Sequence, residues 1–487
     1  MKIKIVFPPS TFTSWPEETP PEGLAKVAGL LRNRGHVVEV DDLHARMMYH
    51  NSRQIFRART LQIELCNNIP SMISYLNREN NTKLKELARN MASLSSFEGY
   101  DLIGISVLYT NQIATSLLLA HALQKELKTR IILGGLGLGT VHNSPFFNLP
   151  LMKSILADTA QFNAENNLTS NMFQDQEPDY TGMPLHLYKH RYFDNQLVIP
   201  YKVDKGCVYK CGFCIYRVVE PFGPLDPKKA VEEILKLKEK HSIKKFDLRT
   251  ATINNNYQKL EEFCELLAEQ KAGIEWLSYA SPSNLDESIL SKMRKSGCRL
   301  LKFGIESGSD RILALLQKPF NRKKASKVLT MAKEQGIRTK VNFIGGAPHE
   351  REQDIHQTIE FIKEHSHLID FANAHGLKVL AHSLMHTKPN DYKITNLQPI
   401  DDNKFSFDEI DGLPWEKKKR QIEYSRAKLQ KALYYRVFRK SGLHSLPFHS
   451  FLPFEVYKFV ERSVRCTQFT HAMWDELRMR KCTYVFN

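Results

Sequence analysis

The chain has no long apolar segment. No stretch of its 487 residues approaches the roughly 20 consecutive apolar residues that a membrane-spanning helix needs. The apolar run Lys2–Phe7 is short and ends at Pro8 and Pro9, whereas a secretion signal needs a longer apolar region and a small-residue cleavage site. We therefore predict a cytoplasmic protein without a membrane partner, in which this run forms a buried first strand.

Cysteines are too few for a disulfide framework. The chain has 8, and most are scattered, namely Cys66, Cys264, Cys298, Cys466 and Cys482. The others are bunched within residues 207–214. In a chain without a secretion signal, such bunching indicates a metal site rather than disulfides.

Acidic residues are scarce relative to basic ones. There are 53 Asp and Glu against 69 Lys and Arg, which gives a net charge of +16. A basic surface attracts nucleic acids or acidic peptides, but no nucleic-acid module is visible, so we do not expect a nucleic-acid partner. A basic helix predicted over 415–440 could contact an acidic leader peptide or RNA. The alternative is a solvated amphipathic face with Ile422, Leu429, Leu433 and Val437 turned inward.

Strand and helix patterns alternate in two separate parts of the chain. Residues 1–142 alternate apolar strands with amphipathic helices and place glycines at strand ends, which predicts a Rossmann-like α/β domain with a parallel sheet. Residues 143–196 have weak periodicity and are expected to form a linker. Residues 197–382 carry six further repeats, which predicts a partial (β/α)6 barrel of the TIM type. Residues 383–487 are expected to form a mainly helical C-terminal extension.

The bunched cysteines, Cys207, Cys211 and Cys214, have C-x3-C-x2-C spacing and follow a predicted strand. Three thiolates on one loop can reach three irons of a cubane [4Fe–4S] cluster. The fourth iron then lacks a protein ligand and can bind the amino and carboxylate groups of a small molecule. Zinc is the alternative, but structural zinc usually has four ligands in paired C-x2-C units, and no second pair is present.

This loop resembles the signature of the radical S-adenosylmethionine (SAM) superfamily, with Phe213 at the aromatic position. Three further stretches resemble motifs of the same family: 278–286 its third-strand region, 304–308 its fourth-strand motif and 342–350 its fifth-strand motif. The resemblance implies that Glu306 approaches SAM, although it could instead be an N-cap acid for the helix that starts at Ser309. The residues that it implies for SAM binding are Phe213, Tyr279, Ser281, Glu306, Ser307, Asn342, Ile344 and Gly345.

The family implies a mechanism and its partners. A reduced cluster cleaves SAM to a 5′-deoxyadenosyl radical, which removes a hydrogen atom from an unactivated carbon of a small-molecule or peptide substrate. The electron would come from a flavodoxin- or ferredoxin-type reductant. This chain departs from its relatives at Arg249, which stands where they usually have an acidic residue. Arg249 could pair with a carboxylate of SAM or substrate, or form a salt bridge inside the barrel mouth.

Residues 1–142 resemble the cobalamin-binding domain that precedes many radical SAM barrels. The resemblance rests on the stretches 7–9, 22–25, 31–36, 104–107 and 133–135, and it implies that Ser106, Gly134 and Gly135 lie along the cobalamin tail. The family usually continues with a Gly-Glu-Gly-Glu-like turn, which is missing from 137–192. Cobalamin binding, and a domain kept only for packing or substrate docking, therefore both stay open.

Together these features predict cobalamin-dependent C-methylation of a natural product or peptide. One alternative is a cobalamin-independent peptide epimerase or another enzyme that matures ribosomally made peptides. In an epimerase, the thiol of Cys466 or Cys482 would return a hydrogen atom to the substrate radical. Another alternative is an RNA- or leader-peptide-binding protein whose cluster is only structural.

Overall fold

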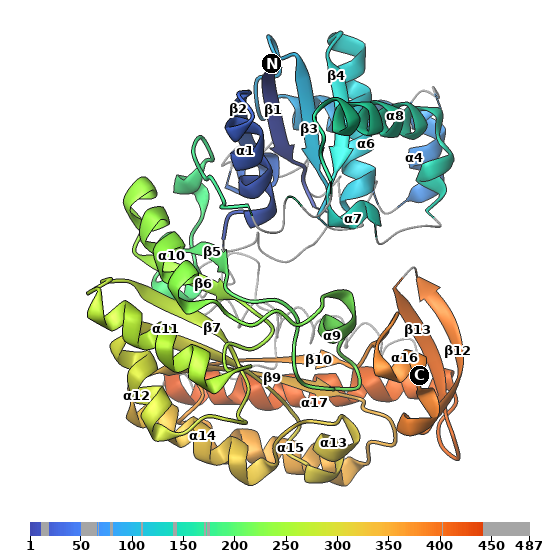
Figure 1. Cartoon of the computed structure of the whole chain (residues 1–487). Helices are drawn as coiled ribbons and strands as arrows, with labels where there is room; N and C mark the ends of the chain where they lie inside the picture. Colours follow the sequence, from blue (N-terminus) through green and yellow to red (C-terminus); the bar gives the residue numbers. More distant parts are fainter. Residues whose placement is uncertain are drawn as a thin grey trace. The chain divides into compact units, whose positions relative to one another are not determined.

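The computed structural model describes residues 1–10, 19–49, 66, 68–77, 81–108, 111–139, 144–169, 172, 176–401 and 403–441. The chain divides into two compact units (Figure 1). One comprises Met1–Pro200 with Lys236–Ile243, and the other comprises Tyr201–Leu235 with Lys244–Asn487. Cys466 and Cys482 lie outside the described residues. Within those residues, no helix has the length and hydropathy of a membrane span.

The first unit is built on a four-stranded parallel sheet in the order β2-β1-β3-β4. The apolar run in β1 is buried on both faces, as expected for a central parallel strand. Helix α6 is buried on nearly every side. The predicted Rossmann-like α/β architecture is confirmed. The elements are β1 (Lys2–Phe7), α1 (Glu22–Asn33), β2 (Val37–Asp42), α2 (Leu43–Tyr49), α4 (Ile69–Leu76), α5 (Thr82–Ala92), β3 (Leu102–Ser106), α6 (Gln112–Glu126) and β4 (Arg130–Gly134).

The segment 143–196, which the sequence predicts as a linker, begins with regular structure. After the short α7 (Leu136–Gly139) come η1 (Pro145–Asn148) and the 16-residue helix α8 (Pro150–Glu165). Helix α8 packs along β4, where Thr159 Oγ1 accepts a 3.1 Å hydrogen bond from Leu133 N. Short turns η3 (Leu185–Leu187) and η4 (Arg191–Phe193) follow.

The second unit contains a six-stranded sheet in the order β10-β9-β8-β7-β6-β5, and this confirms the predicted partial barrel. Neighbouring strands from β6 to β10 all run parallel to one another. Asparagine or aspartate caps start several of the connecting helices, since Asn256, Asp286 and Asn321 each accept a hydrogen bond from the first turn. The elements are β5 (Ile199–Lys202), α9 (Tyr216–Val219), α10 (Pro227–His241), β6 (Lys245–Arg249), α11 (Tyr257–Glu269), β7 (Glu275–Ala280), α12 (Glu287–Lys295), β8 (Cys298–Glu306), α13 (Asp310–Leu315), α14 (Arg322–Glu334), β9 (Arg338–Gly345), α15 (Glu352–Glu364) and β10 (Phe371–Gly376).

In its described residues the C-terminal extension contains a long helix, as predicted, but two strands within it pair with β11 in an antiparallel sheet of order β11-β13-β12 that the sequence did not reveal. Strand β12 is mostly exposed and rich in polar residues, so it lacks the apolar alternation from which strands are predicted. The elements are β11 (Val379–Leu380), α16 (Leu384–Thr387), η5 (Pro389–Tyr392), β12 (Ile394–Asp401), β13 (Lys404–Glu409) and α17 (Trp415–Ser441).

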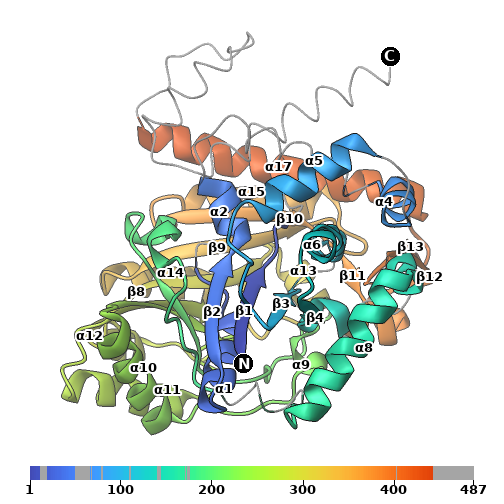
Figure 2. The same ribbon diagram turned by 90° about the horizontal axis from the view of Figure 1, so that it is seen from above.

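Helix α17 packs against strands β9 and β10 at glycines (Figure 2). A Cβ added at Gly345 would lie 2.7 Å from Arg426 N, and one added at Gly376 would lie 2.7 Å from Ile422 Cγ2. The inward face predicted for this helix is confirmed at Ile422, Leu429 and Leu433, which are buried, while the side chain of Val437 lies outside the described part of the chain. Glycine therefore lets the helix backbone approach the sheet.

We expect Gly345→Ala to lower the free energy of unfolding by about 1–3 kcal/mol, because the backbone of α17 must move to admit the methyl group. Urea unfolding measures this change. The control is Gly23→Ala in α1, where an added Cβ has nothing within 4 Å. Equal stability of Gly345→Ala and the unmodified chain would refute the packing role.

Candidate functional site

The three predicted cluster cysteines lie in the loop between β5 and α9, at the carboxyl end of β5. The base of the loop is closed by Lys205 and Gly223, which exchange backbone hydrogen bonds of 3.0 and 3.1 Å. Gly206 has a φ of +64°, and a Cβ there would lie 2.6 Å from Glu220 O. Only glycine suits this turn, which directs the chain into the cysteine segment.

The middle of the loop is anchored on two sides. Gly212 N donates to Leu316 O at 3.0 Å, and Gly212 O accepts from Met385 N at 2.9 Å. The first partner ends α13 and the second belongs to α16 in the C-terminal extension. These bonds fix the segment between Cys211 and Cys214.

The first half of the loop is held by the loops after β6 and β7. Val208 N donates to Asn255 Oδ1 at 3.3 Å, and Ser283 Oγ donates to Tyr209 Oη at 2.5 Å. A loop held from four elements is suited to a cluster, because its ligands need not be ordered when the metal binds.

The three thiols are half-buried and act on one another electrostatically. Burial raises the pKa of each thiol, that of Cys214 to about 11, and a neighbouring thiolate raises the pKa values of Cys207 and Cys214 further. The charge of the Lys318 ammonium lowers the pKa of all three thiols and so opposes the effect of burial. Iron would replace these protons, so ligation and proton release are coupled.

The donor set fits three irons of a cubane cluster. In the described part of the chain, no three His, Cys, Asp or Glu side chains gather around one point as a single metal ion requires. The fit of a cubane cluster to this site therefore rests on three thiols that lie in one anchored loop and act on one another electrostatically. The other described cysteines, Cys66, Cys264 and Cys298, are buried elsewhere.

Glu306 faces this loop from the end of β8 with an unusual backbone. The φ of Glu306 is +69°, in the left-handed region of the backbone. The register between β8 and β9 also shifts between Gly304 and Glu306. A Cβ at Gly304 would overlap Glu306 Oε1, so glycine there admits the folded-back carboxylate. Ser309 is the N-cap of α13, so the alternative role of Glu306 as that cap is not realised. Non-glycine residues in this conformation cluster at functional sites.

Glu306 is paired with Lys318, which sequence reasoning missed. Lys318 Nζ lies 3.4 Å from Glu306 Oε1, and both side chains are 9% exposed. Burial raises the pKa of Glu306, and Lys318 opposes this effect. Burial lowers the pKa of Lys318, but the charges of Glu306 and Cys211 outweigh it and raise that pKa. The ammonium also lies 5.7 Å from the ring centroid of Phe213, so an ion pair stands beside the cysteine loop.

Arg249 forms the salt bridge that the sequence offered as its alternative role. Its Nε lies 3.2 Å from Asp247 Oδ2, and Asp247 Oδ1 accepts from Lys302 Nζ at 3.0 Å. Lys302 lies 4.6 Å above the ring of Tyr279, its register partner on the neighbouring strand. Tyr216 of α9 interacts electrostatically with Tyr279, Cys214 and Arg249. The charges of Arg249 and Tyr279 thus act on the pKa of Tyr216, which follows Cys214 by two residues.

The hydroxyls of the other predicted SAM residues bond within the protein. Ser281 Oγ and Ser283 Oγ are 2.7 Å apart, and Ser307 Oγ lies 3.0 Å from Thr358 Oγ1. Gly345 faces α17, while Asn342 and Ile344 are half-buried on β9. Contacts of these residues with SAM therefore stay predictions.

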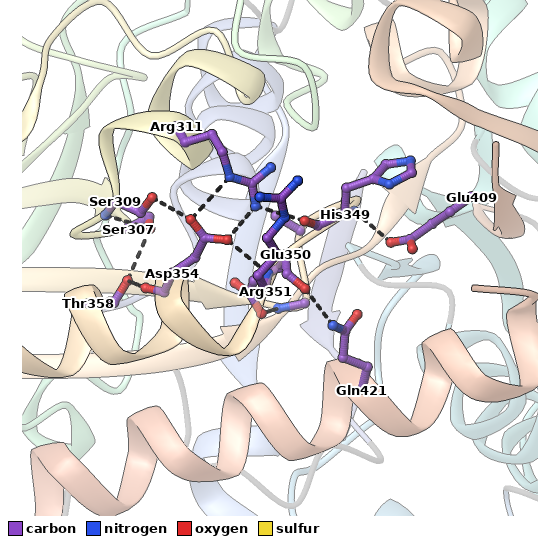
Figure 3. A network of polar contacts seen from close by, with 12 residues as sticks. Ser307, Ser309, Arg311, His349, Glu350, Arg351, Asp354, Thr358, Glu409 and Gln421 are labelled. Atoms are coloured by element: carbon purple, nitrogen blue, oxygen red, sulfur yellow. Dashed lines mark hydrogen bonds and ion pairs between the residues drawn. The ribbon is translucent and has the colours of Figure 1, made fainter. Parts of the chain in front are cut away.

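Figure 3 shows how the loop after Glu306 is fixed. Asp354 of α15 accepts from Ser309 Oγ at 2.7 Å, from Arg311 Nε at 3.2 Å and from Arg351 N at 2.8 Å. Burial raises the pKa of Asp354, but these donors outweigh it and lower that pKa. The network holds the loops after β8 and β9 together.

In the first unit, Gly134 and Gly135, which the resemblance places along the cobalamin tail, differ in whether the fold itself requires glycine. A Cβ at Gly135, whose φ is +117°, would overlap Val107 O, so the fold itself requires glycine there. Gly134 is exposed, and a Cβ would have nothing within 4 Å. Ser106 is half-buried at the end of β3. Gly134 is therefore the position that tests cofactor binding separately from folding.

Asp204, between β5 and the cysteines, gives a pH prediction for the protein without iron. Burial raises its pKa from 3.8 to about 6, although hydrogen bonds from Thr250 and Asn255 oppose this effect. The folded state thus keeps a proton that the unfolded state loses between these values, so stability falls as the pH rises through this window. Relative to Asp204→Asn, the unmodified chain should lose roughly 2 kcal/mol between pH 4 and 7.

Urea unfolding at several pH values measures this difference. Asp411→Asn, in an exposed turn, is the control and should follow the unmodified chain. Parallel pH profiles for Asp204→Asn and the unmodified chain would contradict the assignment.

The model of the Radical SAM superfamily matches residues 201–362, which include the cysteine loop, Glu306 and Lys318. Residues 201–362 are a radical SAM domain. Such a domain uses SAM and a [4Fe–4S] cluster, so the chain is an enzyme.

Comparisons with individual proteins agree with this domain. The chain is similar to an uncharacterized methyltransferase of Pyrococcus horikoshii, at 25% identity over 201 residues, which are 40% of this chain and 43% of that protein. The aligned segments span 28% to 52% of the length of the curated relatives that the chain matches.

Two solved structures share the fold over most of the chain. The radical SAM methyltransferase TsrM of Kitasatospora setae, solved with cobalamin and a [4Fe–4S] cluster, has a TM-score of 0.51 at 13% identity, over 79% of this chain and 74% of that one. The cobalamin-dependent radical enzyme OxsB, solved with aqua-cobalamin and SAM, has a TM-score of 0.56 at 14% identity, over 99% of this chain and 75% of that one. At these identities the similarity concerns the fold.

Proposed function

We propose that this chain reductively cleaves SAM at a [4Fe–4S] cluster held by Cys207, Cys211 and Cys214, and that the resulting 5′-deoxyadenosyl radical removes a hydrogen atom from an unactivated carbon. That carbon would then receive a methyl group that a second SAM supplies by way of cobalamin. The substrate would be a natural product or a peptide. The observation that carries the proposal is the three-thiol loop, anchored at Gly212, with the Glu306–Lys318 pair beside it. When bound, the cluster supplies the electron for cleavage of SAM.

The paired charges suit the amino-acid end of SAM. An ammonium and a carboxylate side by side are complementary to an α-carboxylate and an α-ammonium group. We assign Lys318 to the carboxylate of SAM and Glu306 to its ammonium. Because both side chains are buried, their field is less screened by water than that of a surface pair. These two residues would orient SAM toward the open iron.

Two anaerobic measurements test the proposal. After reconstitution with iron, sulfide and cobalamin, the absorption spectrum should contain the broad iron–sulfur band together with corrinoid bands. Reduction with dithionite, or with a flavodoxin- or ferredoxin-type donor, should release 5′-deoxyadenosine from SAM. Failure to cleave SAM with a fully loaded cluster would refute the proposed radical cleavage.

Gly134 offers a test of cobalamin binding that leaves the fold intact. We expect Gly134→Leu to weaken corrinoid binding about tenfold or more, since an intruding side chain costs about 1–3 kcal/mol. The midpoint of thermal unfolding should hardly change, because nothing lies within 4 Å of an added Cβ. Gly23→Leu, at an equally open glycine of α1, is the control. If Gly134→Leu retained as much corrinoid as the unmodified chain, the result would count against the carboxyl end of β4 as the cofactor site.

A cobalamin-independent peptide epimerase is the second candidate, and the short sheet favours it. In the described part of the first unit, the sheet has four strands, and the sequence lacks the Gly-Glu-Gly-Glu-like turn after them. Mass spectrometry of the product separates the candidates. Methylation adds one methylene group, whereas epimerisation in deuterium oxide exchanges one hydrogen for deuterium.

A further inference from the structure

A buried hydroxyl of the C-terminal extension lacks a hydrogen-bond partner. Tyr392, the last residue of η5, is 1% exposed. Within the described residues, its Oη is buried and makes no hydrogen bond. Buried hydroxyls in proteins are nearly always paired, because an unpaired one has lost its hydrogen bonds to water. This orphaned donor therefore points to a partner that is not an amino acid of the described chain.

The Tyr392 ring lies directly against the cysteine loop. A Cβ added at Gly212 would overlap the ring and would lie 2.8 Å from Tyr392 Oη. Gly212 follows Cys211 in the sequence, and its own carbonyl already accepts from Met385 N. The absence of a side chain at Gly212 is what lets the phenol approach the loop so closely.

The hydroxyl is a donor, and Cys211 is near enough to influence it. Burial raises the pKa of Tyr392 to about 12, and the charges of Asp391 and Cys211 act in the same direction. The phenol thus keeps its proton at neutral pH. A protonated phenol packed against the residue that follows Cys211 can donate to sulfur of a bound cluster, because sulfur of an iron–sulfur cluster accepts such bonds.

We propose that the Tyr392 hydroxyl donates a hydrogen bond to sulfur at the Cys211 corner of the cluster, and that it thereby raises the reduction potential of the cluster. This inference rests on the proposed function, because it presupposes the cluster. The physical reason is that the partial positive charge of the O–H group stabilises the electron added on reduction. A segment outside residues 201–362 would then set how readily SAM is cleaved.

The test is a redox titration of the loaded chain, followed by electron paramagnetic resonance. Tyr392→Phe keeps the ring against Gly212 and removes only the hydroxyl. We expect its midpoint to become more negative, so that the ratio of reduced to oxidised cluster at a fixed potential falls on the order of tenfold, which corresponds to about 59 mV for one electron.

Tyr201→Phe is the matched control. Tyr201 is also buried in the second unit, but its hydroxyl donates to Glu233 of α10 at 2.7 Å. Its loss should leave the midpoint unchanged. Replacing Tyr392 with 3-fluorotyrosine, whose hydroxyl is a stronger donor, should move the midpoint in the positive direction. This second variant retains the hydroxyl and so tests the inference even where Tyr392→Phe loads poorly.

The outcomes separate this inference from the proposed function. An unmodified chain that binds no [4Fe–4S] cluster would refute the proposed function itself. A loaded chain whose midpoint is the same with tyrosine, phenylalanine and 3-fluorotyrosine at position 392 would refute only the hydrogen bond. A shift of equal size in Tyr201→Phe would also refute it, since the effect would then not be specific to this hydroxyl.

Discussion

Replacing Cys211 with alanine should abolish the iron–sulfur absorbance and reduce SAM cleavage by more than about a thousandfold. Without three thiolates the loop cannot hold a cubane cluster with one open iron. The reaction then returns toward its uncatalysed rate, and enzymes typically accelerate reactions at least 10⁶-fold. Iron content and the absorption spectrum measure the loss of the cluster, and release of 5′-deoxyadenosine measures the loss of SAM cleavage.

Cys264→Ala is the control for this substitution. Cys264 is buried on α11 and not in the loop that carries Cys207, Cys211 and Cys214, so its thiol is not placed to bind the cluster. This variant should load a full cluster and cleave SAM at the normal rate. If Cys211→Ala kept its cluster, or if Cys264→Ala lost it, the assignment of the ligands would be wrong.

The second large effect is expected at Lys318. Lys318→Met removes one partner of a buried ion pair and leaves the Glu306 carboxylate without its counter-charge. Breaking such a pair typically costs about 3–5 kcal/mol of unfolding free energy. Because burial already raises the pKa of Glu306, the loss should shrink at low pH, where this carboxyl takes up a proton. SAM binding should weaken as well, since the proposed carboxylate contact is lost.

The same substitution at an exposed ion pair is the control. Lys428 pairs with Glu352 at the surface, so Lys428→Met should change stability by less than about 1 kcal/mol. The double variant Glu306→Gln/Lys318→Met removes both buried charges and should regain much of the stability. Urea unfolding of all three variants gives the comparison. A Lys318→Met variant no less stable than Lys428→Met would show that the buried pair carries little free energy.

The sequence was sufficient for features that depend on local spacing. The βα repeats predicted the barrel because apolar periodicity is a local signal, and the cysteine spacing located the loop. Lys318 was missed because one lysine in a basic chain has no distinguishing neighbours. Its position beside Glu306 follows from the turn after α13, where Gln317 has a φ of +56°. Likewise, the motif around Gly345 predicted a cofactor contact and gave no sign that α17 packs there.

The bond from Met385 N to Gly212 O has a practical consequence for fragments of this protein. A fragment trimmed to residues 201–362 would keep the three clustered cysteines, Glu306 and Lys318, yet it would lack one of the two backbone supports of the loop and the whole of Tyr392. An exchange of the segment that carries Met385 and Tyr392 would for the same reason also alter the backbone support and the packing of the cysteine loop.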